Sequence, residues 1–143
     1  MNTHDEQRLL RRAVELSEAA VASGNPPFGS LLAGPDGTVL AEDHNTSITD
    51  GDITAHPELK LARWAARELD AATAAATTMF TSCEPCGMCA GALARSGLGR
   101  VVFAMSSEQL TALKPAGSGF EPVPQSGPAL FDEARRPIES FYG

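Results

Sequence analysis

The sequence lacks the marks of several large protein classes. No apolar run approaches the roughly 20 residues that cross a bilayer. The first six residues, MNTHDE, lack the charged-then-apolar layout of a signal peptide. No segment of the chain repeats another. These absences argue against membrane, secreted and solenoid proteins, and we predict a cytoplasmic protein without a membrane partner.

Positive charge and cysteine are also scarce. Lys and Arg number 11 against 18 Asp and Glu, which gives a net charge of -7. Such a surface repels phosphate backbones, so we expect no nucleic-acid partner. The three cysteines lie close together, between Cys83 and Cys89, and an odd number at short spacing makes a poor disulfide framework. In a reducing compartment, clustered thiols more often bind metal or do redox chemistry.

The 143 residues are 43% hydrophobic and 20% charged, which is a globular composition. This length is enough for one domain with its own core. Composition shifts near Lys114, after which Gly, Pro and Ser become dense up to about Pro128. We therefore predict a core over residues 1–113, followed by a loop and C-terminal arm of the same domain over 114–143.

Hydrophobic spacing predicts alternating helices and strands. Apolar residues recur at helical intervals over 5–23, with Asp5 as the expected N-cap and Gly24 as the expected stop. Further along the chain we expect strands at 28–33, 38–42, 77–82 and 100–105, and helices at 57–69 and 85–97. Helices that alternate with the later strands imply parallel pairing there. The predicted fold is a three-layer α/β/α domain around a mixed sheet whose later strands are parallel.

Two of the predicted helix starts carry candidate metal ligands. Cys86 and Cys89 are three residues apart, so both thiols can grip one ion from a single helical turn. The positive end of the helix dipole favours the thiolate that zinc requires. His56, at the start of the other helix, supplies a third, neutral ligand. Three protein ligands leave a fourth position for water, which is typical of a catalytic zinc site.

Glu58 follows His56 by two residues and begins the same helix. It can therefore face a water on the metal without binding the metal itself. Zinc lowers the pKa of a bound water to about 7. A carboxylate beside that water can take its proton and deliver it elsewhere, so we predict Glu58 as the catalytic acid–base group.

These residues form a known pattern. His56-Pro57-Glu58, followed about 30 residues later by Pro85-Cys86-Gly87-Met88-Cys89, matches the signature of zinc deaminases. Over residues 5–106 the chain resembles the cytidine deaminase superfamily. It is most similar to the branch of guanine deaminases, fungal-type cytosine deaminases and tRNA adenosine deaminases. Pro27-Phe28-Gly29, Asn45 and the stretch 81–86 support this resemblance.

The resemblance implies a cytidine-deaminase-like fold, a Zn²⁺ cofactor and attack of activated water on the amino-bearing carbon of a ring. Glu58 would protonate the ring nitrogen and then the departing ammonia. It also implies substrate contacts at five positions: Phe28, Asn45, Ala55, Ser82 and Glu84. Glu108 is the only acid just beyond the last predicted strand, so we take it as the candidate for reading an exocyclic amine.

We therefore predict a zinc-dependent hydrolase that deaminates a small aminated nucleobase or nucleoside in purine metabolism. The stretch Ser82–Cys86 looks more like guanine deaminases, which places guanine-type purines ahead of cytosine. Relatives of this family are dimers or tetramers, so we expect a homodimer, with Trp64 and Met88 as candidate contacts.

Two alternatives stay open. The first is a tRNA adenosine deaminase, disfavoured by the acidic balance and by the absence of a C-terminal helix rich in Lys and Arg. The second is a non-catalytic binding module stabilised by zinc, with Cys83 as a fourth ligand. Glu58 argues against it, because a structural site needs no carboxylate beside the metal. Pro57 and Gly87 depart from the residues common in the family.

Overall fold

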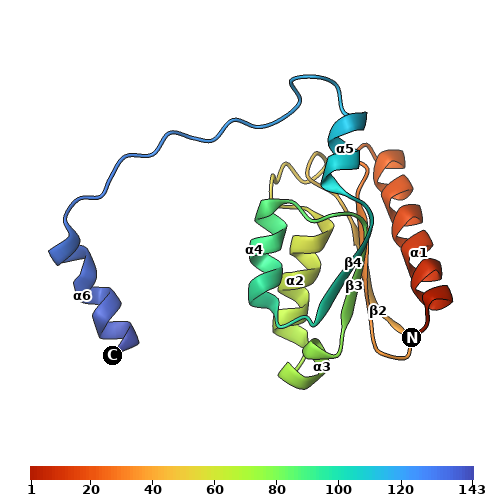
Figure 1. Ribbon diagram of the computed structural model, residues 1–143, viewed down its shortest axis with the longest axis horizontal. Helices are drawn as coiled ribbons and strands as arrows, with labels where there is room; N and C mark the ends of the chain where they lie inside the picture. The colour runs from red at the N-terminus through yellow and green to blue at the C-terminus, as the bar shows by residue number, and fades with distance from the viewer.

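The computed structural model describes all residues from 1 to 143 and confirms the predicted three-layer α/β/α fold (Figure 1). The sheet has four strands in the order β2-β1-β3-β4. Strand β1 pairs antiparallel with both β2 and β3, and β3 pairs parallel with β4. The strands are β1 (Gly29–Ala33), β2 (Val39–His44), β3 (Thr78–Cys83) and β4 (Arg100–Met105).

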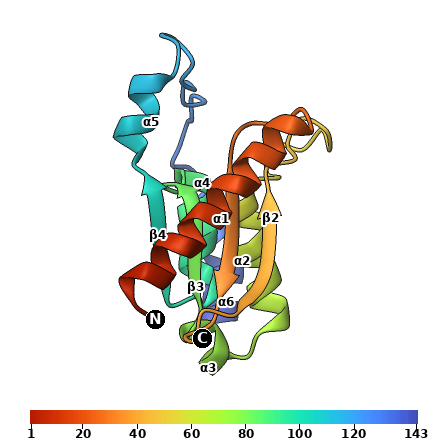
Figure 2. The ribbon, with the colours of Figure 1, turned by 90° about the vertical axis from the view of Figure 1, so that its right-hand side faces the viewer.

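Helices cover both faces of this sheet. Helix α1 (Thr3–Ala22) lies across one face and contacts all four strands (Figure 2). Helices α2 (Pro57–Glu68) and α4 (Gly87–Ser96) lie side by side on the other face. The short helix α3 (Ala71–Ala75) connects α2 to β3. No helix of the chain combines the length and the apolarity that a membrane span needs.

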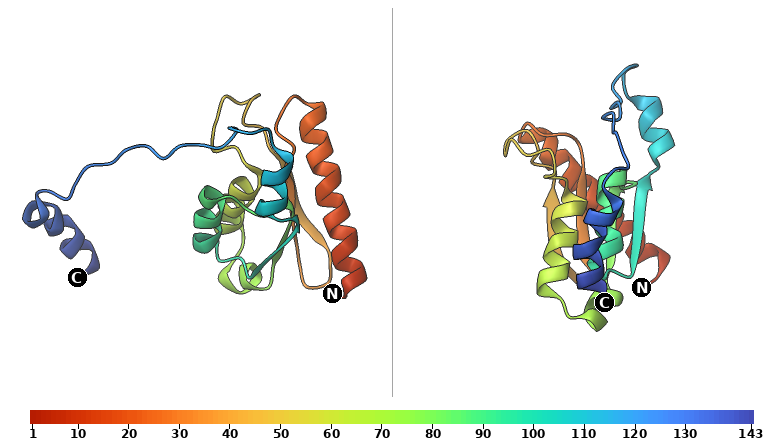
Figure 3. Two further views of the ribbon diagram at one scale, coloured as in Figure 1. Left: turned by 45° about the horizontal axis from the view of Figure 1, so that its top comes forward. Right: turned by 90° about the vertical axis from the view of Figure 1, so that its left-hand side faces the viewer.

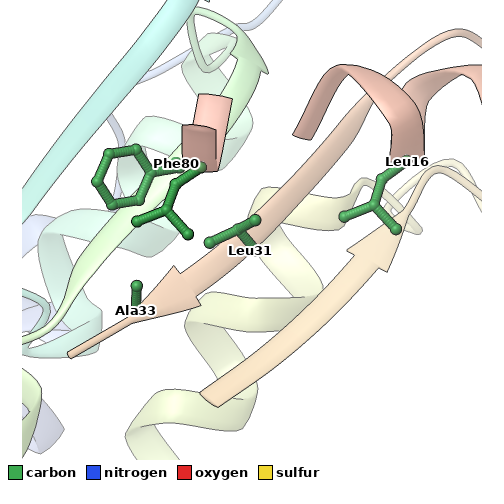
Figure 4. Packing of buried hydrophobic residues seen from close by; sticks show 5 residues of the cluster. Leu16, Leu31, Ala33 and Phe80 are labelled. Atoms are coloured by element: carbon green, nitrogen blue, oxygen red, sulfur yellow. The ribbon is translucent and has the colours of Figure 1, made fainter. Parts of the chain in front are cut away.

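The core consists of two apolar clusters, one on each face of the sheet. On the α1 face, Leu9 and Leu16 pack against Leu31, Ala33 and Phe80 (Figure 4). Because side chains alternate along a strand, Leu32 points to the opposite face. The cluster there comprises Leu32, Leu61, Ala65 and Met79. The central strands β1 and β3 are buried along their whole length because helices cover both of their faces.

The helix ends differ slightly from the predicted ones. The prediction of Asp5 as N-cap was wrong: Asn2 caps α1, and its side chain accepts a hydrogen bond from the Asp5 backbone N–H at 2.9 Å. Asp5 instead takes the third helical position and closes a capping box. Helix α4 begins at Gly87 rather than Pro85, with Cys86 as its N-cap. Gly97 ends α4 in the left-handed region, as expected.

Three helices were not predicted: α3, α5 (Ser107–Leu113) and α6 (Phe131–Tyr142). Helix α5 starts with a capping box in which Ser106 and Gln109 exchange hydrogen bonds. Helix α6 lies beyond the stretch dense in Gly, Pro and Ser, and it contains Pro137. Proline inside a helix removes a backbone donor, so composition alone pointed to irregular structure there.

The C-terminal arm, residues 114–143, leaves the core. Residues 114–130 run as an extended segment that carries α6 away from the sheet and its helices (Figures 1 and 3). Phe131, Ile138, Phe141 and Tyr142 recur at helical spacing on α6, and all four are exposed. The apolar stripe of this helix is therefore uncovered within a single chain.

Candidate active site

The candidate ligands cap two neighbouring helices. His56 is the N-cap of α2, and Cys86 is the N-cap of α4. Both residues have extended backbones, and neither side chain bonds to the end of its own helix. The imidazole and the thiol are therefore free for another role. Cys89, one turn into α4, is fully buried, whereas Cys86 is exposed.

The three donor atoms lie at distances suited to zinc. His56 Nδ1 is 3.6 Å from Cys86 Sγ and 3.5 Å from Cys89 Sγ. All three donors lie within 4.8 Å of one another. Usual Zn–N and Zn–S bond lengths at a tetrahedral angle put a nitrogen and a sulfur ligand about 3.6 Å apart. His56, Cys86 and Cys89 could therefore hold one zinc ion, with the imidazole binding through Nδ1.

The surroundings of Cys89 disfavour a free thiolate. Burial, and then the negative charge of Glu58, raise the pKa of Cys89 far above that of a free thiol. A bound divalent cation reverses this balance, because a coordinated thiol loses its proton. Cys83 lies outside the donor group, and burial raises the pKa of its thiol too. The structure thus brings three donors together and not the four of a closed site.

Glu58 is buried beside these donors, with only 6% of its surface exposed. Its Oε1 lies 3.1 Å from the hydroxyl of Ser30 and 3.4 Å from the hydroxyl of Thr81. These two hydroxyls, on β1 and β3, are 2.8 Å apart. Glu58 is not one of the grouped metal donors. Strands β1 and β3 therefore hold the carboxylate beside the metal donors, where it can accept and return protons.

Sequence reasoning missed Ser30 and Thr81. Both are fully buried within the two central strands. A hydroxyl in a buried strand needs a hydrogen-bond partner, which was the available signal. Their partner became identifiable only once the register placed Ser30 opposite Thr81.

Asn45 offers a free hydrogen-bond donor. It directly follows β2 and is 99% buried. Its backbone N–H donates to the Phe28 carbonyl at 2.9 Å, and its Oδ1 accepts from the Ser47 N–H at 2.8 Å. The Nδ2 amide group makes no hydrogen bond within the chain. It is not fully shielded from solvent, because every fully buried side-chain nitrogen and oxygen has a partner. It can therefore donate to an acceptor on a ligand.

Most of these residues lie at one end of the sheet. The register pairs Gly29, at the start of β1, with His44, at the end of β2. Strand β3 ends at Cys83 at the same end of the sheet, and Ser82 Oγ accepts a hydrogen bond from the Gly29 N–H at 3.1 Å. Ala55 is buried and accepts from the Thr46 N–H at 3.1 Å. The predicted residues Phe28, Asn45, Ala55 and Ser82 therefore share one region of the fold.

The two predicted glutamates lie differently. Glu84 follows β3, and its Oε1 accepts a hydrogen bond from the Ser107 N–H at 2.9 Å. It therefore connects the end of β3 to the start of α5. Glu108 is exposed on the first turn of α5 and makes no hydrogen bond or ion pair. The structure does not join Glu108 to the other candidate residues.

The site is open to solvent. Cys86 and Met88 are exposed at the start of α4. Two hollows in the protein surface lie elsewhere: one is lined by Pro35 and Thr73, and the other by Arg63 and Glu68. Neither hollow includes a metal donor or Glu58. No segment of the same chain closes over the donor group as a lid, because the arm points away (Figure 1).

The chain is similar in sequence to proteins named as deaminases. Residues 3–105 match the cytidine and deoxycytidylate deaminase zinc-binding region. A probable cytosine deaminase of Schizosaccharomyces pombe is 31% identical over 93% of this chain and 90% of its own length. A tRNA-specific adenosine deaminase of Haemophilus influenzae is 33% identical over 76% of this chain and 62% of its own length.

Solved structures agree with this assignment. The X-ray structure of guanine deaminase from Bacillus subtilis superposes with a TM-score of 0.73 and 29% identity, covering 99% of this chain and 94% of that one. A crystal structure of NE0047 in complex with 2,6-diaminopurine superposes with a TM-score of 0.65 and 28% identity, covering 84% and 65%. These matches, together with the His-Cys-Cys group and the buried Glu58, show that the chain belongs to the cytidine and deoxycytidylate deaminase family and is a hydrolytic deaminase.

Proposed function

We propose that the protein is a zinc-dependent deaminase of a small aminated nucleobase or nucleoside, with guanine-type purines as preferred substrates. One observation carries the proposal. Three metal donors lie within 4.8 Å of one another, with His56 Nδ1 3.5–3.6 Å from each thiol, and a buried carboxylate that is not itself a donor lies beside them. A binding module stabilised by zinc has no use for that carboxylate.

His56, Cys86 and Cys89 would hold the zinc, which when bound supplies a Lewis acid that makes water acidic at neutral pH. Glu58 would transfer the protons. Its Oε1 is occupied by Ser30 and Thr81, whereas Oε2 accepts from no N–H or O–H group of the chain. Oε2 is therefore free to take one proton from water and pass it to a ring nitrogen. It can then take the second proton from the hydroxyl added to the ring carbon and pass it to the amine, which leaves as ammonia.

Asn45 would orient the ring. Its free Nδ2 group donates, so it selects an acceptor such as a carbonyl oxygen or an unprotonated ring nitrogen. Purine and pyrimidine bases both carry such acceptors. Preference for a purine rests on the likeness to guanine deaminase along nearly the whole chain and to the complex with 2,6-diaminopurine. Phe28, Ala55, Ser82 and Glu84 remain proposed substrate contacts. Glu108 remains the proposed reader of an exocyclic amine, which requires movement of α5 or a ligand that extends to it.

A tRNA substrate is the second candidate because of the Haemophilus influenzae relative. The charge of this chain opposes it. The C-terminal helix carries Asp132, Glu133 and Glu139 against Arg135 and Arg136, and the net charge of the whole chain is -7. Binding of a polyphosphate depends on clustered Lys and Arg.

The decisive test is ammonia release by the purified zinc-loaded protein across guanine, 2,6-diaminopurine, cytosine, their nucleosides and tRNA. We expect the highest kcat/KM with a guanine-type base. Turnover on tRNA alone would replace this proposal with the second candidate. A fully zinc-loaded protein that releases no ammonia from any of them would contradict the proposed substrate class.

We further propose that the protein works in the cytoplasm as a homodimer in which the arm of one copy covers the site of the other. Free thiols at the site suit a reducing compartment. Helix α6 exposes an apolar stripe that its own core does not cover. Met88 and Cys86 are exposed near the opening of the site. The α6 helix of a second copy could cover this opening and bury its own apolar stripe.

A further inference from the structure

Lys60 makes an unusual set of contacts for a lysine near the surface. It lies in the first turns of α2, two residues after Glu58, and its side chain is only 18% exposed. Its Nζ lies 2.9 Å from each of three acceptors: Asp43 Oδ1, the His44 carbonyl and Thr46 Oγ1. An ammonium has three N–H donors. All three are therefore used within the chain, and none is left for a ligand.

The acceptors flank one residue. Asp43 and His44 precede Asn45, and Thr46 follows it. Asn45 itself makes three hydrogen bonds. Its N–H donates to the Phe28 carbonyl, its Oδ1 accepts from the Ser47 N–H, and its carbonyl oxygen lies 2.9 Å from His44 Nδ1. Lys60 thus bonds to the chain on both sides of Asn45, whose side-chain amide is free to bind a ligand.

The same side chain connects two elements of the site. Helix α2 begins with His56 as its N-cap and carries Glu58. No other side chain of α2 makes a hydrogen bond to β2 or to the residues that follow it up to Thr46. Beside the backbone bond from the Thr46 N–H to the Ala55 carbonyl, Lys60 therefore supplies the side-chain link between the Asn45 segment and the helix that carries Glu58.

We infer that Lys60 is a positioning residue that fixes the substrate-binding Asn45 segment to the helix bearing the proton-transfer group. The inference rests on the proposed function, in which Asn45 contacts the substrate. Lys60 does not touch the ring. It holds the segment whose Asn45 side chain binds the ring.

The alternative is an ordinary stabilising ion pair, and the chain supplies a matched control for it. Arg12, on α1, makes two hydrogen bonds to Glu42, at 2.7 and 2.9 Å. Glu42 is the residue just before Asp43 on the same strand. The Arg12–Glu42 pair therefore ties β2 to a helix as Lys60 does, but it does not touch residues 43–46.

The test compares Lys60→Met, which keeps the stem and removes the ammonium, with Arg12→Met in the full-length zinc-loaded protein. Steady-state kinetics use the best substrate from the base panel. For Lys60→Met we expect KM to rise at least about tenfold and kcat to change less than about threefold, because a contact present in ground and transition states alike acts on KM. Zinc content should stay at one per chain, and Arg12→Met should keep the KM of the unmodified protein.

Hydrogen exchange gives a readout that needs no substrate. The amides of Asn45 and Ser47 should exchange at least about tenfold faster in Lys60→Met and unchanged in Arg12→Met, since loss of the charged bonds frees the segment. If Lys60→Met does not fold, Asp43→Asn weakens the same contacts from their exposed side and should raise KM about threefold.

Two results would overturn the inference: an unchanged KM in a Lys60→Met protein that turns over normally, or an equal rise of KM in both variants. Failure of the proposed function looks different, because the unmodified protein would then deaminate no base. In that case the exchange rates alone decide whether Lys60 holds the segment.

Discussion

Glu58 sits where a carboxylate is costly unless its partners are in place. It is buried, it raises the pKa of the Cys89 thiol, and two hydroxyls of the sheet hold one of its oxygens. A buried charge is unfavourable unless it is paired or hydrogen-bonded. The residue is therefore best understood through its chemistry, which predicts specific effects of single substitutions.

Glu58→Gln should retain zinc and lose turnover. The amide keeps the shape of the side chain but cannot accept and return a proton, so kcat should fall by about 10²–10⁴-fold. Zinc analysis and ammonia release measured on the same preparation check this. A variant that turns over a true substrate at the normal rate would remove Glu58 from the mechanism.

Ser30→Ala should slow turnover without loss of metal. It removes the hydroxyl that lies 3.1 Å from Glu58 Oε1, and a hydrogen bond to a charged group contributes about 1.5–3 kcal/mol. We expect kcat to fall by about tenfold or more, while zinc stays at one per chain. Ser23→Ala, which changes a helix-capping hydroxyl far along α1, is the control and should leave kcat unchanged.

At the scale of elements, the site depends on two helix starts lying side by side. Both N-caps keep their side chains off the helix end, so the histidine and the cysteine converge. Cys86→Ala and Cys89→Ala should each lose most of their zinc, because two ligands rarely retain it. Cys83→Ala should keep a full complement, since Cys83 lies outside the donor group. Metal analysis that finds full zinc in either of the first two variants contradicts the assignment.

The packing of α1 on β1 leaves no room at one glycine. A Cβ added to Gly29 would come within 2.5 Å of the Ala13 carbonyl and of the Ser17 amide nitrogen, both of which belong to the α1 backbone. Overpacking against backbone costs about 1–3 kcal/mol. Gly29→Ala should therefore lower the midpoint of thermal unfolding by several degrees, whereas Gly119→Ala, which meets nothing, should not.

At the scale of the whole molecule, the proposed homodimer depends on the C-terminal arm. Truncation after Leu130 removes α6 and its exposed apolar stripe. We expect zinc to stay bound while activity falls sharply, because the open site admits bulk water and weakens its electrostatics. Light scattering should show twice 14.9 kDa for the full chain and a weaker dimer after truncation. A full-length protein that scatters as a monomer at micromolar concentration would contradict the proposed homodimer.

Much of this protein could be predicted from local sequence alone. Helical and strand periodicity located all four strands and the three longer helices of the core, because burial of one face imposes that spacing within a few residues. The ligand types and the offset from His56 to Glu58 likewise lie within single turns. The residues of the candidate site could therefore be predicted from the sequence.

Other features depend on tertiary structure. Ser30 meets Thr81 across 51 residues of sequence, and Lys60 reaches Asp43 across 17. No local pattern shows which buried hydroxyl will face Glu58, since that depends on the register of β1 against β3. Helix α6 and its separation from the core were equally hard to predict, because no part of the chain's own core covers its apolar stripe. The sequence determined the reactive groups by short-range spacing, whereas the groups that hold them in place were decided by strand pairing and by the packing of α2 on the sheet.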